Sequence, residues 1–195
     1  MLSLETLEEI ISHGKQLALS EEATVNIQKC RLYLDKKMAS QPEAIYGINT
    51  GFGALCNVKI SNENLSKLQE NLVKSHACGI GEEAPLSVVK LMLLLKIQSL
   101  SYGHSGVQLQ TVERLIELYN NDILPVIYTQ GSLGASGDLA PLAHLSLPLL
   151  GEGEVYFEGK KVHSSEVMKI FNWVPIVLQS KEGLALLNGT QFMSA

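Results

Sequence analysis

Cysteines are few in this sequence, and none is spaced for pairing or for metal binding. Cys30, Cys56 and Cys78 are the three cysteines among 195 residues, and no Cys-x-x-Cys pair occurs. Their spacing excludes a zinc ribbon and a dithiol redox motif and favours a reducing, cytoplasmic compartment. The first residues also lack the basic and apolar regions of a secretory signal peptide, so we expect none.

Charged residues are scarce as well. They make up 18% of the sequence, against about 25% in an average soluble domain. The 15 basic and 20 acidic residues give a net charge of −5, which argues against nucleic acid or an anionic membrane as a partner. Since 46% of the residues are hydrophobic, we expect more buried surface than a lone domain needs, as in an oligomer or a part of a larger protein.

Uninterrupted hydrophobic runs are also missing. The longest apolar stretches are broken by Lys90 and Lys96, or by Pro141, His144 and Pro148. Neither stretch reaches the roughly 20 apolar residues that a membrane-spanning helix requires. We therefore expect no membrane partner.

Phosphate-binding and metal-binding motifs are absent as well. No Gly-Lys-[Ser/Thr] follows a glycine run, as a P-loop requires. Residues 51–56 begin like a dinucleotide-binding glycine motif, but Cys56 stands where the packing glycine belongs. No cluster of metal ligands is evident either. We expect no nucleotide and no metal cofactor.

The pattern of caps and apolar positions predicts a mainly α fold with a small β-hairpin and minor strands. Thr6–Glu9 is a capping box that predicts the start of a first helix, and Gly14 ends it. Ser20 is expected to cap a second helix, running to about Ser40. Further helices are predicted at about 62–78, 85–102, 105–120, 138–150 and 164–171, with a hairpin at 154–163 around Glu158-Gly159 and an extended segment at 184–193 leading into a new helix. The helix at 85–102 is apolar almost all round and should be a buried central helix.

A loop of small residues at 129–138 is the candidate catalytic segment. A serine hydrolase elbow reads Gly-x-Ser-x-Gly, and the second glycine here comes one residue too early after Ser136. His144 lies about two helical turns beyond Ser136, a poor position for a local Ser–His pair. We expect His144 to be a core histidine on an apolar helix.

The tripeptide Ala135-Ser136-Gly137 offers another chemistry. The amide nitrogen of Gly137 can attack the carbonyl carbon of Ala135, because glycine has no side chain to block the approach. Loss of water closes a five-membered ring, and loss of the Ser136 hydroxyl then leaves an exocyclic methylidene. The product is an electrophile made from the backbone alone. By itself, such a tripeptide is more commonly a flexible loop that caps a helix.

Four ordered motifs surround this tripeptide. They are residues 131–144 (Gly-Ser-Leu-Gly-Ala-Ser-Gly-Asp-Leu-Ala-Pro-Leu-Ala-His), 46–53 (Tyr-Gly-Ile-Asn-Thr-Gly-Phe-Gly), 71–79 (Asn-Leu-Val-Lys-Ser-His-Ala-Cys-Gly) and 187–191 (Leu-Asn-Gly-Thr-Gln). Together they resemble the aromatic amino-acid ammonia-lyases, most of all the histidine ammonia-lyases among them. The prosthetic group of that family is 4-methylideneimidazol-5-one (MIO).

The resemblance implies roles for single residues. Ala135, Ser136 and Gly137 match the residues that form MIO, and Asp138 matches the acid beside them that assists ring closure. Tyr46 matches the catalytic base that removes a β-proton from the substrate. Without the motif, Tyr46 would be read as a loop tyrosine that packs on the core.

Two more residues match substrate-binding positions. Asn188 corresponds to the asparagine beside MIO; otherwise it is a turn residue before Gly189. His76 shares a helical face with the leucines at positions 65, 68 and 72, as a core histidine would. In the family, however, the pair Ser75-His76 resembles the histidine enzymes, whereas tyrosine and phenylalanine enzymes have His-Leu or Phe-Leu. The pair implies L-histidine as substrate and urocanate as product.

The resemblance also implies the architecture. Residues 1–195 correspond to the N-terminal, MIO-bearing domain of the aromatic amino-acid lyase (fumarase/aspartase-like) fold, without its C-terminal helical half. Family members are homotetramers with active sites shared among subunits, and their carboxylate-binding arginine, second tyrosine and imidazole-facing glutamate lie in the absent half. We therefore expect this chain to be inactive alone, with Ala135-Ser136-Gly137 uncyclised. The alternatives are a tyrosine or phenylalanine ammonia-lyase, an aminomutase, or a non-catalytic interaction module.

Overall fold

The computed structural model describes residues 2–40, 43–50, 60–61, 64–134 and 136–195. It confirms a mainly helical chain with a small hairpin and minor strands. In chain order the elements are α1 (Leu4–Ser12), α2 (Glu21–Ser40), α3 (Leu65–His76), β1 (Ile80–Glu83), α4 (Leu86–Ser101), α5 (Leu109–Asn120), β2 (Leu124–Pro125), β3 (Tyr128–Gln130), α6 (Leu139–Ser146), a 3₁₀ turn (Leu147–Leu150), β4 (Glu154–Phe157), β5 (Lys160–His163), α7 (Ser164–Ile170), α8 (Glu182–Leu187) and α9 (Gln191–Ser194).

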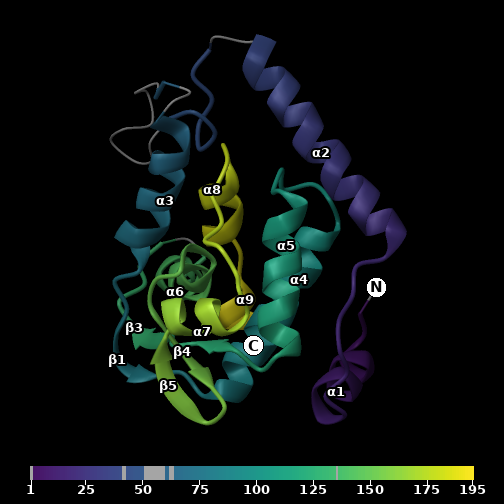
Figure 1. Ribbon diagram of the computed structural model, residues 1–195, viewed down its shortest axis with the longest axis vertical. Helices are drawn as coiled ribbons and strands as arrows, with labels where there is room; N and C mark the ends of the chain where they lie inside the picture. The colour runs from purple at the N-terminus through teal and green to yellow at the C-terminus, as the bar shows by residue number, and fades with distance from the viewer. Residues whose placement is uncertain (1, 41–42, 51–59, 62–63, 135) are drawn as a thin grey trace.

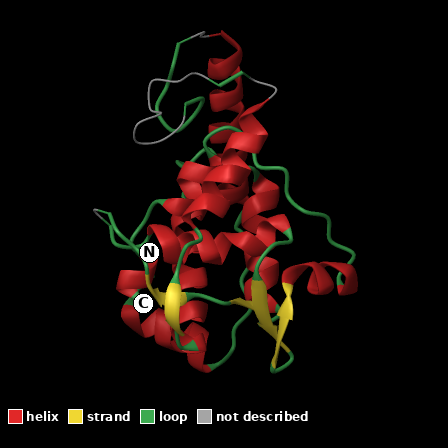
Figure 2. Cartoon of the chain, turned by 90° about the vertical axis from the view of Figure 1, so that its left-hand side faces the viewer, coloured by secondary structure: helices red, strands yellow, loops and turns green. Residues whose placement is uncertain are grey.

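The helices form the body and the strands collect at one end of it. Figure 1 shows α3, α8 and the α4–α5 pair in the body, with α2 along one side. Figure 2 shows the strands in the lower part of the molecule, with helices above and beside them. They make two small antiparallel sheets, β1–β3 and β2–β4–β5. The hairpin has the predicted location, and Val155 pairs with Val162 across it.

The hydrophobic core is centred on α4, as the sequence predicted. Val89, Met92 and Leu93 of this helix are completely buried. They belong to a cluster that also includes Leu115 of α5 and Leu142 of α6. Burying such side chains removes large apolar areas from water, which is the main force that holds this chain together.

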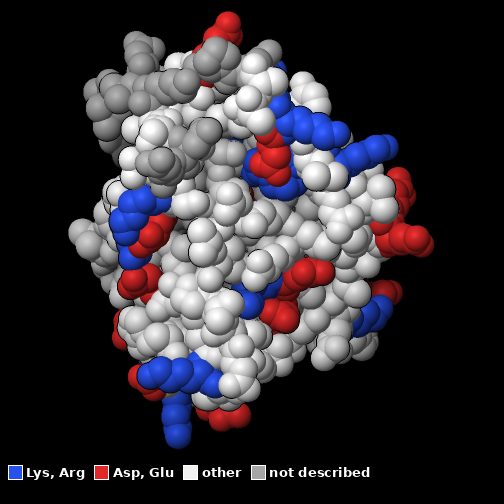
Figure 3. Space-filling view, turned by 45° about the horizontal axis from the view of Figure 1, so that its top comes forward, with Lys and Arg blue, Asp and Glu red and all other residues white. Residues whose placement is uncertain are grey.

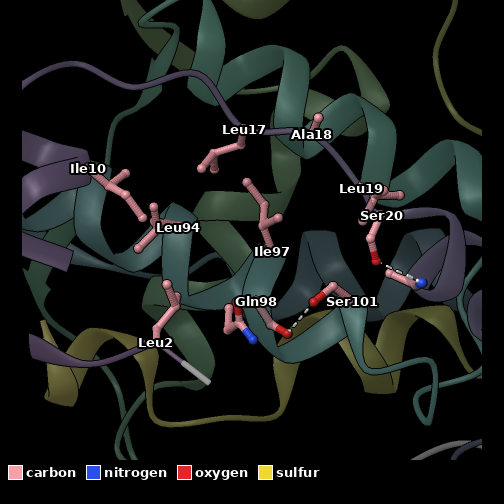
Figure 4. Close-up of a pocket in the computed structure, with 11 residues that line it drawn as sticks. Leu2, Ile10, Leu17, Ala18, Leu19, Ser20, Leu94, Ile97, Gln98 and Ser101 are labelled. Carbon is pink, nitrogen blue, oxygen red and sulfur yellow. Dashed lines mark hydrogen bonds between the residues drawn. The ribbon is translucent and has the colours of Figure 1, made fainter. Parts of the chain in front are cut away.

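An N-terminal arm, residues 2–20, folds back onto α4. Figure 4 shows Leu2, Ile10 and Leu17 of the arm around the same space as Leu94 and Ile97 of α4. These side chains line a cavity of about 300 Å³. Asn120 at the end of α5 exchanges two hydrogen bonds with the main chain of Leu17, at 2.8 and 2.9 Å. The arm is thus attached by both apolar contact and backbone bonding.

Helix starts are where the sequence prediction was least accurate. Ser3, not Thr6, caps α1, because its hydroxyl accepts a hydrogen bond from the Thr6 amide. The helix predicted from 105 begins at Leu109 instead. The amide of Gln108, just before it, donates to the carboxylate of Glu182 on α8. Ser20 caps α2 as predicted, accepting from the Ala23 amide.

The helix predicted over 138–150 and the segment predicted as extended over 184–193 also need correction. The first ends as α-helix at Ser146 and continues as the 3₁₀ turn, which contains Pro148. The second is helical up to Leu187, because α8 is packed between α3 and α6 rather than laid along a sheet. Only Asn188 after it has an extended backbone.

Candidate functional site

The small-residue loop leads directly into α6. Ser132 supplies the cap of this helix, since its hydroxyl accepts a hydrogen bond from the Ala140 amide at 3.2 Å. Gly131 lies against the Cys78 carbonyl, where a Cβ would approach the oxygen to 2.9 Å. Glycine is therefore required at this close approach. The start of the loop is therefore packed against Cys78 and hydrogen-bonded to the first turn of α6.

Ser136 and Gly137 form the described part of the candidate MIO tripeptide; Ala135 lies outside the described residues. The Ser136 hydroxyl accepts a long hydrogen bond, 3.3 Å, from the amide of Asp138. Gly137 has a φ of +72° and its amide donates to the Gly134 carbonyl at 3.3 Å. A Cβ built on Gly137 would have Met193 Cε as its nearest contact, at 3.7 Å. The Gly137 position is therefore open on that side.

Asp138 is buried, with 1% of its surface exposed. Its side chain does not cap its own helix, α6. Instead, Oδ2 accepts hydrogen bonds from the amides of Phe192, at 2.8 Å, and Met193, at 3.2 Å. These amides belong to the first turn of α9, where N–H groups have no partner within the helix. Asp138 thus joins the candidate MIO loop to the segment that follows Asn188.

Asn188 ends α8 and is exposed. Its side-chain amide donates to the Leu184 carbonyl at 3.1 Å. Gly189 follows with a φ of +150°, and a Cβ there would lie 2.0 Å from Gln191 Oε1. No residue with a side chain fits at position 189 without moving Gln191. The turn after Asn188 consequently depends on this glycine.

Lys96 is the site residue that sequence reasoning missed. The sequence shows it only as an interruption of an apolar run, yet the side chain is 1% exposed. Its Nζ donates to the carbonyl of Ala185 at 2.7 Å and to that of Asn188 at 2.9 Å. Burial lowers the pKa of Lys96 to about 7, and the negative charge of Asp138 opposes this shift. A buried, perturbed lysine beside a buried aspartate is typical of functional sites.

His76 is the last residue of α3 and is half-buried. Its Nδ1 lies 2.8 Å from the Leu72 carbonyl oxygen. A carbonyl only accepts hydrogen bonds, so Nδ1 carries the hydrogen in this contact. The predicted face of α3 is confirmed, because Leu65 and Leu72 are buried beside it.

His144 is a core histidine, as the sequence predicted. Its Nε2 accepts a hydrogen bond from the Gly79 amide at 2.9 Å, and its ring meets Tyr128 edge-on at 5.2 Å. Burial lowers its pKa, which keeps Nε2 available as an acceptor. His144 therefore ties α6 to the chain that follows His76.

Tyr46 lies in a separate part of the chain, the turn at 45–50. Asn49 organises this turn, since its Oδ1 accepts from the Ile45 amide and its Nδ2 donates to the Glu43 carbonyl. The Tyr46 side chain is 55% exposed. The end of its motif, residues 51–53, lies outside the described residues.

The structure brings some of the predicted residues together and separates others. Asp138 connects the Ser136–Gly137 loop to the chain beyond Asn188, and Lys96 reaches the Asn188 carbonyl. The turn that carries Tyr46 instead shares a pocket with Lys181, which precedes α8. Asn188 ends that helix, and six helical residues span about 9 Å. The turn at 45–50 and Asn188 therefore lie toward opposite ends of α8.

Several features bear on other classes of function. Within the described ranges, no group of three or more His, Cys, Asp or Glu side chains is arranged to hold a metal ion. Cys30 and Cys78 are free thiols. None of the helices described here has the length and apolar character needed to cross a bilayer. On the face in Figure 3, acidic and basic side chains are interspersed around a broad uncharged area.

A family model decides the relationship of this chain to known proteins. The model of the aromatic amino acid lyases matches residues 2–195. The chain belongs to this family. The resemblance expected from the four motifs is therefore confirmed.

Similar proteins include named ammonia-lyases and aminomutases. A protein from Deinococcus radiodurans named histidine ammonia-lyase is 48% identical over 194 residues, which is 100% of this chain and 37% of the relative. The crystal structure of histidine ammonia-lyase from Trypanosoma cruzi has a TM-score of 0.87 at 37% identity, covering 99% of this chain and 37% of that one. A phenylalanine aminomutase from Pantoea agglomerans has a TM-score of 0.90 at 32% identity, covering 98% and 37%.

The chain thus spans 37% of the length of the Deinococcus relative. Its fold is that of the corresponding part of the solved lyases and aminomutases, as expected from the resemblance.

Proposed function

We propose that residues 1–195 are the N-terminal, MIO-bearing domain of an ammonia-lyase. The enzyme would eliminate ammonia from L-histidine to give urocanate, a step in histidine degradation. The observation that carries the proposal is the Ser136–Asp138 loop in a chain of this family, with its acid buried against α9. Free thiols at Cys30 and Cys78 support a cytoplasmic location.

Ser136 and Gly137 fit the group that the family implies. Gly137 has a left-handed backbone and an open position, and glycine has no side chain that would block attack by its amide nitrogen. Among the described residues, the Ser136 hydroxyl accepts the long hydrogen bond from the Asp138 amide, at 3.3 Å, and a contact of this length holds the hydroxyl weakly. Asp138 would assist ring closure from its fixed position. When present, MIO would supply the electrophile that the elimination requires.

The remaining residues would bind the substrate and move its proton. His76, which matches a substrate-binding position of the family, would contact the imidazole of the substrate. The exposed amide of Asn188 would hydrogen-bond the bound substrate beside the loop. Tyr46 would remove the β-proton, and a well-placed base of this kind contributes roughly 10²–10⁴-fold to the rate.

The position of Tyr46 supports a shared active site. Because its turn lies at the opposite end of α8 from Asn188, we propose that Tyr46 serves the loop of a second copy in a homotetramer. The chain alone would then lack part of the site, including the family's arginine, second tyrosine and glutamate. We therefore expect the isolated 195-residue chain to be inactive and uncyclised.

Intact mass and product analysis test the proposal. In the complete enzyme, Ser136→Ala should abolish the mass deficit of two water molecules and lower activity by at least about 100-fold, since the hydroxyl that must leave is gone. Ser132→Ala is the matched control: it removes a hydroxyl from the same loop that serves only as a helix cap, and the deficit should persist. Persistence of the deficit in Ser136→Ala contradicts the assignment. A closed ring in the isolated 195-residue chain contradicts the expectation that it stays uncyclised.

The second candidate is an enzyme for a different aromatic amino acid. The likeness to a phenylalanine aminomutase favours it, whereas the Ser75-His76 pair favours histidine. Assays of the complete enzyme with L-histidine, L-tyrosine and L-phenylalanine separate the two. Urocanate as the product supports histidine, and a cinnamate-type product or a β-amino acid without urocanate overturns it.

A further inference from the structure

A lysine at the centre of an apolar core helix needs an explanation. Lys96 is one of seven buried residues of α4, and the other six are hydrophobic. Burying an amine without partners is strongly unfavourable, because the group loses its hydration. The proposed chemistry assigns it no role.

The partners of Lys96 all belong to one segment. Its Nζ reaches the carbonyls of Ala185 and Asn188, at 2.7 and 2.9 Å. Both carbonyls lie at the C-terminal end of α8, where a helix leaves its last carbonyls without partners and favours a positive charge. A neutral amine has two N–H groups and can donate to the same two oxygens. The contact with Asn188 therefore persists in either protonation state.

Asp138 holds the other side of the same segment. Its carboxylate accepts from the amides of Phe192 and Met193. Residues 188–191 thus run between a lysine that binds the carbonyls before the turn and an aspartate that binds the amides after it. Within the part of the chain that the structure describes, the Asn188 side chain bonds back to Leu184 of its own helix. Its direction consequently follows from where the main chain is held.

We propose that Lys96 is a positioning residue: from α4 it fixes the main chain of Asn188 relative to the Ser136–Gly137 loop and so determines where the Asn188 amide is presented. This inference rests on the proposed function. If Lys96 only satisfied its own burial, replacing it would leave the Asn188 main chain in place. If it positions Asn188, replacing it must loosen the main chain there.

Hydrogen exchange of the 195-residue chain tests the anchoring itself. Lys96→Met keeps the unbranched stem and removes the donors, and replacing a buried charge with an apolar residue of similar volume is often neutral for stability. Amides of residues 188–190 should then exchange at least about tenfold faster. Lys90→Met is the control, because Lys90 lies on the same helix but pairs with Asp122. Unchanged exchange in Lys96→Met overturns the inference.

Kinetics of the complete enzyme test the consequence. Lys96→Met should lower kcat by roughly 10–100-fold, the scale of a small misplacement at a site, with KM nearly unchanged and the mass deficit retained. In an Asn188→Ala background the same substitution should have little further effect, because both changes remove one function. Additive effects, or a lost mass deficit, overturn the inference.

A variant that does not fold and a failure of the proposed function can each be told apart from a failure of this inference. If Lys96→Met does not fold, Lys96→Gln is judged by the same readouts. If the wild-type complete enzyme releases no ammonia from any aromatic amino acid, the proposed function fails, whereas the exchange result still decides whether Lys96 anchors Asn188.

Discussion

Helices α2 and α4 are both long, but they are stabilised in different ways. Helix α4 has seven buried residues in 16, whereas α2 has three in 20. The outer side of α2 exposes Leu32 at 59% and Tyr33 at 66%. Figure 1 shows α4 inside the body and α2 along its flank. The comparison teaches that this chain completes its own core around α4 and leaves apolar surface uncovered along α2.

The largest effect is expected from a cavity in the α4 core. Leu93 is completely buried, so Leu93→Ala should lower the free energy of unfolding by about 2–5 kcal/mol. Urea unfolding measures this change. A loss below about 1 kcal/mol would mean that α4 is not the centre of the core. The two helices would then not differ in how they are stabilised.

The next effect concerns the buried amine of α4. Burial lowers the pKa of Lys96 from 10.5 to about 7 in the folded chain, against the opposing charge of Asp138, the charged group that faces it. Between these values the unfolded chain holds a proton that the folded chain has released, so rising pH favours folding. Relative to Lys96→Met, the wild-type chain should therefore gain stability across this window. A pH-independent difference between the two unfolding energies contradicts the shift.

A smaller effect is expected where α2 attaches to the body. Arg31, 8% exposed, donates to the carbonyls of Gly106 and Ser180 at 2.7 and 2.8 Å. Arg31→Ala leaves these oxygens without their donor and should lower stability by about 1–3 kcal/mol. Lys29→Ala, on the exposed side of the same helix, is the control and should stay within about 0.5 kcal/mol. Equal effects would show that α2 has no specific anchor.

The smallest effect is expected on the outer side of α2. Leu32→Ser should change the free energy of unfolding by no more than about 0.5 kcal/mol, because the side chain is already in contact with water. Thermal unfolding of wild type and variant measures it. A large loss of stability would mean that another copy of the chain covers this surface. In that case α2 would also be buried in the oligomer, and the difference between α2 and α4 would disappear.

The sequence was sufficient for elements whose determinants are local. Ser20 predicted the start of α2, and Glu158-Gly159 predicted the hairpin turn, since caps and turns depend on neighbouring residues. Thr6 was mistaken for the cap because Thr6–Glu9 fits the capping-box pattern. Ser3 has no Glu or Gln three residues later, yet its hydroxyl accepts from the Thr6 amide and caps the helix.

The rest depended on contacts between distant residues. The position of α8 depends on Glu182, a buried carboxylate that accepts hydrogen bonds from Gln108 and Thr111 of the α5 region. The role of Lys96 depends on carbonyls 89 and 92 residues further along the chain. No spacing in the sequence reports such contacts. The motifs placed the chain in its family, but they did not indicate what holds Asn188.

The bond between Asp138 and α9 also has a consequence for the order of assembly. Its amide partners come 54 and 55 residues later in the chain. A chain made from its N-terminus therefore contains Ser136 and Gly137 well before the group that fixes their neighbouring acid. During synthesis, the loop must wait until Met193 has emerged and α9 has docked before Asp138 reaches its buried place.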